Sequence, residues 1–310
     1  MEDLRLDRWL AAKQLLRDTG DDWTLRTSRS QVLAYVAADS NAIDAWCIEE
    51  PNDWDALMMR ARVLTQRVLN AHRDGVPRRD LMNAVYAART ACSLAANRWP
   101  ADPVPNVCYL ALVQTDTDCG APHNPLHWAA RDDMLPPGPW KLLDWARERD
   151  PYNREAFHRM LNVLHARGED GLYFAQGAAA SAPAGSALKV LPLYSFVESY
   201  RRQRENGQTL SATGFWAIGG QARHARRALH DWFEQTTPAA GQPDTRSLLD
   251  LNYLAYGLTA TGVGDAAGVF EAIGPYVTTA PWVLVTPNPA WWQDDFLSAR
   301  GRALSVGGRR

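Results

Sequence analysis

Two histidines and a glutamate on one predicted helix offer the clearest candidate chemistry in this chain. Glu155, His158, Asn162 and His165 follow one another at offsets of three, four and three, so their side chains share one helix face. A Glu-x-x-His pair supplies half of a di-iron site in helical bundles, but the sequence contains no second such pair. His158 and His165 lie ~10 Å apart along the helix, too far to chelate one ion by themselves. The face is therefore either a recognition surface or a solvated helix surface.

The segment 115–139 gathers histidine, cysteine and carboxylate in a break between predicted helices. Zinc sites use these side chains, so the segment is a candidate metal site. Pro125 separates His123 from His127, however, which disfavours a regular helical histidine pair, and Cys119 has no neighbouring thiol. We therefore expect no metal and no other cofactor. The segment remains either a packed surface loop or a lid that touches a ligand or partner, because long irregular segments in compact domains are often functional.

The well-defined catalytic signatures are missing from the sequence. No Gly-rich phosphate loop of the form GxGxxG or GxxxxGK[ST] occurs, and no GxSxG nucleophile elbow. The paired aspartates at 21–22, 132–133 and 294–295 lack the spacing of the magnesium motif found in terpene cyclases. The sequence therefore favours a protein that is not an enzyme, without excluding one.

Composition and charge are those of an ordinary globular protein. The chain has 310 residues, 46% hydrophobic and 22% charged, and a net charge of −2, so no global field attracts nucleic acid or an anionic membrane. The four cysteines form no CxxC pair. The N-terminus is acidic, and no run approaches the ~18 apolar residues of a membrane span. We expect a cytoplasmic protein that binds neither membrane nor nucleic acid.

Apolar residues recur with helical periodicity along most of the chain, so the predicted fold class is all-α, with at least 55% helix and no sheet of more than two strands. We expect one domain over 1–303, with a possible subdivision near 115–139, an irregular segment from Trp282 onward, and a frayed tail over 304–310. The predicted helices are 4 to about 20, 32–38, 53–70, 80–98, 104–113, 140–149, 154–166, 170–180, 188–204, 214–235, 247–259 and 265–273.

Thirteen tryptophans are spread through these elements. A tryptophan can fill the gap between packed helices, and several together can instead line an aromatic ligand pocket. The sequence alone leaves both interpretations open.

Three stretches repeat one arrangement of large and small residues. In one of them Phe157 is followed by Leu161 and Leu164, with Gly168 at a turn and Pro183 at the end. The other two show the same order. They comprise Leu251, Ala255, Leu258, Gly262, Ala267, Phe270 and Pro281, and Trp54, Leu57 and Met58 with Ala84, Ala88, Ala91 and Pro100. This arrangement resembles the tetratricopeptide repeat (TPR) family over about 60% of the chain, although no unit is a clean consensus.

The resemblance implies stacked antiparallel helical hairpins, a TPR-like α-solenoid, whose concave groove binds a protein or peptide. The lysines of the carboxylate clamp in peptide-binding members are absent, which puts binding of a C-terminal carboxylate in doubt. By this resemblance the binding residues are Asp55, Met59, Arg62, His158, Asn162, His165, Asn252 and Tyr256.

The alternative to a groove is an all-α enzyme or small-ligand-binding protein. It would have an aromatic pocket covered by the 115–139 loop. In that case His158 and His165 should converge with His123 or His127 and with acidic groups.

Overall fold

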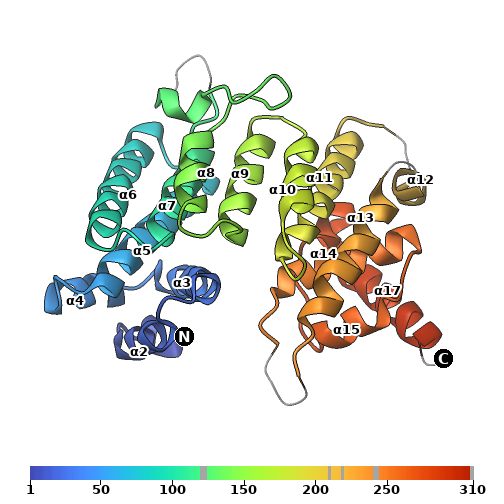
Figure 1. Ribbon diagram of the computed structural model, residues 1–310, viewed down its shortest axis with the longest axis horizontal. Helices are drawn as coiled ribbons and strands as arrows, with labels where there is room; N and C mark the ends of the chain where they lie inside the picture. The colour runs from blue at the N-terminus through green and yellow to red at the C-terminus, as the bar shows by residue number, and fades with distance from the viewer. Residues whose placement is uncertain (119–123, 209–210, 218–219, 240–243, 308–310) are drawn as a thin grey trace. The chain divides into compact units, whose positions relative to one another are not determined.

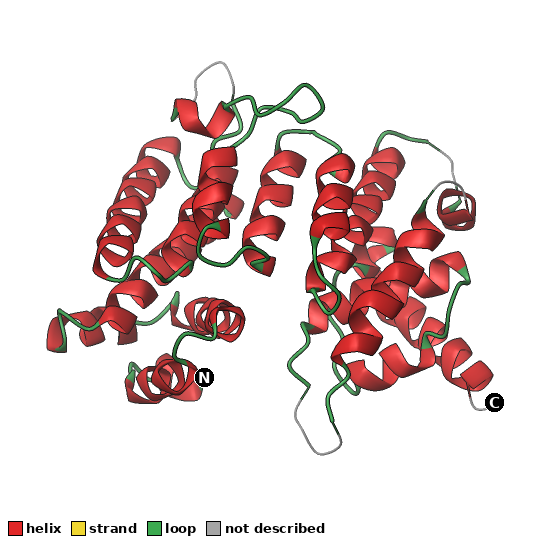
Figure 2. Cartoon of the chain, in the orientation of Figure 1, coloured by secondary structure: helices red, strands yellow, loops and turns green. Residues whose placement is uncertain are grey.

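The computed structural model describes residues 1–118, 124–208, 211–217, 220–239 and 244–307. This part of the chain consists of helices joined by loops and turns (Figure 2). Helix accounts for 71%, and the described residues contain no β-strand, only an isolated bridge between Ala129 and Gly138. The predicted all-α class and the predicted helix content are confirmed. No helix in these ranges is long and apolar enough to cross a membrane.

The chain divides into two compact units, residues 1–169 and 170–310. The boundary follows Glu169 and does not lie in the 115–139 segment, where the sequence suggested a possible subdivision. Each unit has its own hydrophobic core.

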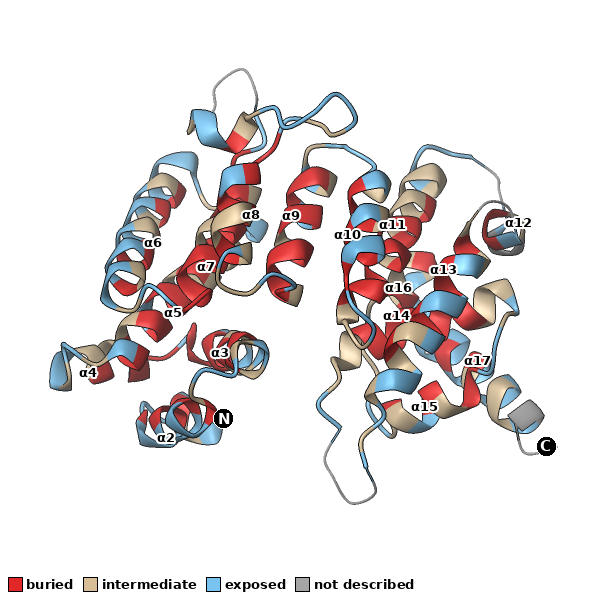
Figure 3. Ribbon diagram, viewed as in Figure 1, coloured by how far each residue is buried: buried red, intermediate tan, exposed pale blue. Residues whose placement is uncertain are grey.

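The helix α7 (Val104–Leu112) lies at the centre of the first unit, where every residue except Tyr109 is buried (Figure 3). It packs against α5, α6, α8 and α9, and α8 and α9 lie side by side (Figure 1). The other helices of this unit are α1 (Glu2–Arg5), α2 (Leu10–Thr19), α3 (Trp23–Ala37), α4 (Ala42–Glu49), α5 (Trp54–Arg73), α6 (Arg78–Arg98), α8 (Trp140–Arg147) and α9 (Arg154–Ala166), with 3-10 turns at Val113–Thr115 and Pro125–Trp128.

Side-chain caps mark the start of three helices of the first unit, α3, α5 and α9. Asp22 accepts a hydrogen bond from the backbone N–H of Leu25 at the start of α3, and Asn153 accepts one from Ala156 at the start of α9. Asp53 caps α5 by accepting from two backbone N–H groups. Such caps satisfy donors that have no partner within the helix.

Aromatic rings hold the second unit together. Trp282 meets the rings of Tyr256 and Phe296 edge to face, with centroids 5.5 and 5.2 Å apart. Trp216 contacts Tyr256 in the same way at 5.2 Å. The helices that carry these rings and their neighbours are α10 (Leu172–Ser181), α11 (Leu191–Glu205), α12 (Ala212–Ala217), α13 (Gln221–Ala228), α14 (Leu248–Thr261), α15 (Ala267–Ile273), α16 (Trp282–Val285) and α17 (Trp292–Gly307), with shorter turns at Ala187–Val190, Leu229–Phe233, Glu234–Thr236 and Pro289–Trp291.

The C-terminal region differs from the expected irregular tail. Phe296 and Ala299 of α17 are buried in the second core, so this helix is held by tertiary contacts that its polar sequence did not reveal. Within the expected frayed tail, 304–307 are helical, and 308–310 lie outside the described residues.

The helix α9 packs through Phe157, Leu161 and Leu164, all buried as predicted. We expect Phe157→Ala to lower the free energy of unfolding by roughly 3–5 kcal/mol, because it removes a buried aromatic ring and leaves a cavity. Tyr173→Ala, at an exposed position of α10, is the matched control and should cost far less. Chemical denaturation measures both values, and a loss below about 1 kcal/mol for Phe157→Ala would contradict the observed packing.

Candidate functional site

Most of the binding residues predicted from the sequence lie inside the two cores. Met59 and Asn252 are completely buried, and four others are nearly so: Asp55, Arg62, His158 and Tyr256. Of the eight predicted residues, only Asn162 is exposed and only His165 is half-buried. The expectation that all eight face an open groove is therefore corrected, because most of them are engaged in ion pairs, hydrogen bonds or ring contacts within their own unit.

Arg62 on α5 is a buried cation that donates four hydrogen bonds. Its two terminal nitrogens donate to Glu155 on α9 at 2.8 and 2.5 Å. Its remaining donors reach the hydroxyl of Ser30 and the carbonyl oxygen of Thr27 on α3, at 3.2 and 3.1 Å. The guanidinium therefore joins three helices that are far apart in the sequence.

Glu155 has two cationic neighbours in this network. Arg159, one turn further along α9, donates to it at 2.9 and 3.0 Å. Burial by itself would raise the pKa of Glu155, but Arg62 and Arg159 outweigh burial and lower this pKa to about 2. The same pairing raises the pKa of Arg62 against the opposing effect of burial.

Asn252 and Tyr256 belong to the aromatic core of the second unit. The side-chain oxygen of Asn252 accepts a hydrogen bond from the indole N–H of Trp282 at 3.0 Å, and its amide donates to the carbonyl oxygen of Leu248 at 2.8 Å. Tyr256 lies between the rings of Trp216 and Trp282. These contacts give both residues a packing role.

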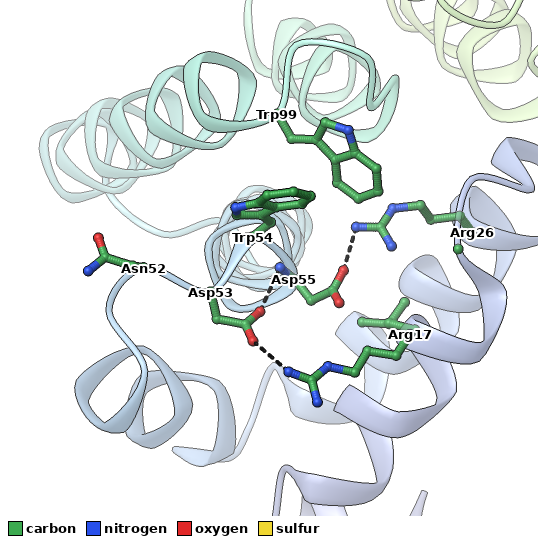
Figure 4. A pocket seen from close by; sticks show the side chains of 9 residues that line it. Arg17, Arg26, Asn52, Asp53, Trp54, Asp55 and Trp99 are labelled. Carbon is green, nitrogen blue, oxygen red and sulfur yellow. Dashed lines mark hydrogen bonds and ion pairs between the residues drawn. The ribbon is translucent and has the colours of Figure 1, made fainter.

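A cleft of about 340 Å³ opens at the N-terminus of α5 and is walled by tryptophan (Figure 4). The ring centroids of Trp54 and Trp99 lie 5.2 Å apart, and Trp23 meets Trp99 edge to face with centroids 5.4 Å apart. Trp54 is 50% exposed, which is unusual for so large an apolar side chain. The cleft is lined by Leu16, Arg17, Gly20, Arg26, Asn52, Asp53, Trp54, Asp55 and Trp99.

Charged groups of both signs surround the two indole rings of the cleft. Asp55 pairs with Arg26 at 2.6 Å, and Asp53 lies 3.8 Å from Arg17. Arg26 also donates to Asp102 at 2.8 Å and lies over the ring of Trp99, 4.6 Å from its centroid. The charged residues that line the cleft are Asp53 and Asp55, which are acidic, and Arg17 and Arg26, which are basic.

The surroundings shift the pKa values of the two carboxylates that line the cleft in opposite directions. Burial raises the pKa of Asp55 even though Arg26 opposes the rise. The pKa of Asp53 is lowered instead, because hydrogen bonds from the α5 backbone and the nearby Lys13 outweigh burial. The carboxylate of Asp53 at the cleft rim is thus held in its charged form.

Sequence reasoning missed this cleft although it included Asp55. Trp54 was placed on the buried face of α5, and neither Trp99 nor Arg26 was singled out. The tripeptide Asp53-Trp54-Asp55 at a helix start carried a usable signal, since it puts an indole between two carboxylates on the first turn.

The 115–139 segment contributes His127, which is buried and paired with Asp116 through Nδ1 at 2.6 Å. Cys119 and His123 lie outside the described residues. A cavity beneath the segment is lined by His127 but by neither His158 nor His165, so the predicted convergence of histidines does not occur in the part of this site that the structure describes. Among the described residues of the chain, no group of three or more His, Cys, Asp or Glu side chains could hold a metal ion.

No protein-family model, curated protein or solved structure matches this chain. The function therefore has to be inferred from the residues themselves.

The lowered pKa of Glu155 predicts how the first unit responds to acid. A carboxyl group whose pKa falls from 4.5 to about 2 on folding stabilises the folded state above pH ~4.5, and this contribution is lost as pH falls towards 2. We expect Glu155→Gln to lower the free energy of unfolding at pH 7 by roughly 3–5 kcal/mol, since it leaves Arg62 buried without a counter-charge.

The variant should also lose less stability than the wild type between pH 4.5 and 2. Denaturation at a series of pH values measures both effects. Glu148→Gln, at an exposed position, is the control and should follow the wild-type curve. Equal slopes for Glu155→Gln and wild type would show that Glu155 is not the group responsible.

Proposed function

We propose that this protein is a non-enzymatic recognition protein that binds a protein or peptide partner through the cleft at the start of α5. The observation that carries this proposal is the exposed indole of Trp54, set beside Trp99 and flanked by two carboxylates. Tryptophan is among the residues that most often dominate binding energy at interfaces, above all where it lines a pocket.

The chemistry of the cleft favours a cationic guest. The face of an indole ring attracts ammonium and guanidinium groups, most strongly where water is partly excluded. Asp53 supplies a charged carboxylate at the rim, beside the exposed indole of Trp54. An arginine or lysine side chain of the partner would therefore stack on Trp54 and pair with the acidic rim.

Preformed geometry lowers the cost of such binding. Asp55 is held by Arg26, and Asp53 is fixed by the two N–H groups that it caps. Side chains that are already ordered lose little conformational entropy when a ligand arrives.

We propose that a TPR-like stack of helical hairpins is the scaffold that carries this cleft. In support of it, α5 packs against α6 and α14 against α15, two of the helix pairs that the resemblance would count as hairpins. The recognition site moves, however, from the concave helix faces to the end of one helix. Asn162 and His165 stay accessible on α9 and could extend the contact surface of the first unit.

The experiment is a selection followed by affinity measurements. Random dodecapeptides displayed on phage are selected against the purified protein, and the enriched sequences are synthesised with a fluorescent label for polarisation assays. We expect the enriched peptides to share an arginine or lysine. Trp54→Ala should weaken their binding at least tenfold, about 1.4 kcal/mol.

Trp291→Ala is the matched control, because Trp291 is also strongly exposed, at 63%, but lies in the second unit. It should leave affinity unchanged, and both variants should melt close to the wild type. Enrichment of peptides without basic residues, or full affinity in Trp54→Ala, would refute the proposal.

A further inference from the structure

A second cavity, of about 170 Å³, lies in the first unit beneath the short turn Pro125–Trp128. Its walls come from α6, α7 and α8, and its roof from the turn 125–128. The lining residues are Val85, Arg89, Tyr109, Leu112, Thr115, Asn124, Leu126, His127, Leu142 and Trp145. None of them lines the tryptophan cleft, so the two sites are separate.

Arg89 and His127 are the two basic side chains in the lining of this cavity, beside the polar Tyr109, Thr115 and Asn124. Asp116 accepts a hydrogen bond from Nδ1 of His127, which leaves Nε2 as the free ring nitrogen, and no described residue bonds to it. Arg89 is half-buried and forms no ion pair with any carboxylate in the described ranges. A buried imidazole and an unpaired guanidinium therefore line one small space.

The remaining wall is apolar and of a definite size. Val85, Leu112 and Leu142 are buried, and the ring of Trp145 completes this side. A cavity of roughly 150 Å³ lined by aliphatic side chains is known to hold one benzene molecule. The space thus suits one ring or a short branched chain.

Arg167, at the C-terminal end of α9, holds the roof in place. It donates to the carbonyl oxygens of His127 and Asp116 at 2.8 and 3.1 Å, and it stacks on Trp128 with 3.5 Å to the ring centroid. A roof tied to a helix end keeps its shape when the site is empty, so the cavity is preorganised.

We propose that this cavity binds a small monocarboxylic acid with a single ring or a branched alkyl group. Its carboxylate would lie between Arg89 and Nε2 of His127, and its apolar part against Leu112, Leu142 and Trp145. Arginine is well suited to a carboxylate because its planar donors can meet both oxygens.

We expect ligand binding in this cavity to be coupled to protonation of His127. Burial lowers the pKa of His127, and Arg89 and Arg167 lower it further, while Asp116 opposes them, so the imidazole is neutral near pH 7 in the free protein. A bound carboxylate adds a negative charge beside Nε2 and raises this pKa. Binding then takes up a proton, and affinity rises as pH falls from about 8 to 6, where a carboxylic acid stays ionised. Among the described wall residues, Tyr109 is a further titratable group, and its hydroxyl donates to the carbonyl oxygen of Arg89.

The test is a set of ¹⁹F NMR titrations of the full-length protein with three probes, 4-fluorobenzoate, 4-fluorobenzamide and 4-fluorobenzylamine. The three probes share ring and size but carry an anion, a neutral amide and a cation. We expect the benzoate to bind at least tenfold more tightly than the other two, and more tightly at pH 6 than at pH 8. Equal binding of the three probes, or no binding of the benzoate, would overturn the proposal.

Variants locate the site. Arg89→Met should weaken benzoate binding roughly ten- to a hundredfold, as expected for a charge-assisted hydrogen bond. Arg98→Met, at an exposed position on the same helix, should have no effect. If Arg89→Met is poorly folded, Leu126→Asp serves instead, because Leu126 is partly exposed and a carboxylate there would pair with Arg89 and repel the probe.

Trp54→Ala should bind the benzoate as the wild type does, so failure of the cleft proposal and of this one can be told apart. Full benzoate affinity in a folded Arg89→Met or Leu126→Asp variant would overturn the assignment of the site.

Discussion

A guanidinium taken out of water must regain its hydrogen bonds inside the protein, and the first unit is organised around this requirement at Arg62. The side chain is almost completely buried and binds Glu155, Ser30 and the carbonyl oxygen of Thr27. Removing two charges from water is costly, and only good geometry with further hydrogen bonds offsets that cost. The arrangement of α3, α5 and α9 satisfies all of these partners at once.

Both candidate sites of the first unit depend on the helices that this network joins. Arg26 and Asp55 of the tryptophan cleft are carried by α3 and α5, and Arg26 is itself a buried cation with two carboxylate partners. Arg167, which holds the roof of the second cavity, follows the end of α9. A shift of α9 relative to α5 would therefore disturb Glu155 and Arg167 together. In the second unit, the described residues pack around the aromatic rings that meet at Trp282.

The sequence predicted well whatever depends on local pattern. The helix 154–166 and the burial of Phe157, Leu161 and Leu164 followed from periodicity, because neighbouring turns determine which face is apolar. Arg62 and Met59 were placed on a recognition face by the resemblance to TPR repeats. The partner of Arg62 is 93 positions away in the chain, and no local pattern reveals a contact of that separation.

The candidate sites show the same limit. The repeat arrangement groups Trp54 with Leu57 and Met58 on one helix face, yet its position on the first turn of α5 leaves it half exposed beside Trp99. The 115–139 segment was identified as a candidate lid from its length and its histidines. Its pairing of His127 with Asp116, and the open position of Arg89 beneath it, depend on how three helices meet.

The central claim is that the Arg62–Glu155 pair couples α5 to α9. A double-mutant cycle of Arg62→Met and Glu155→Leu, followed by urea denaturation at pH 7, measures this coupling directly. Each single change should cost several kcal/mol because it leaves one buried charge unpaired, whereas the double variant should recover much of that loss, a coupling free energy of about 2 kcal/mol or more. Losses that simply add in the double variant would contradict the claim.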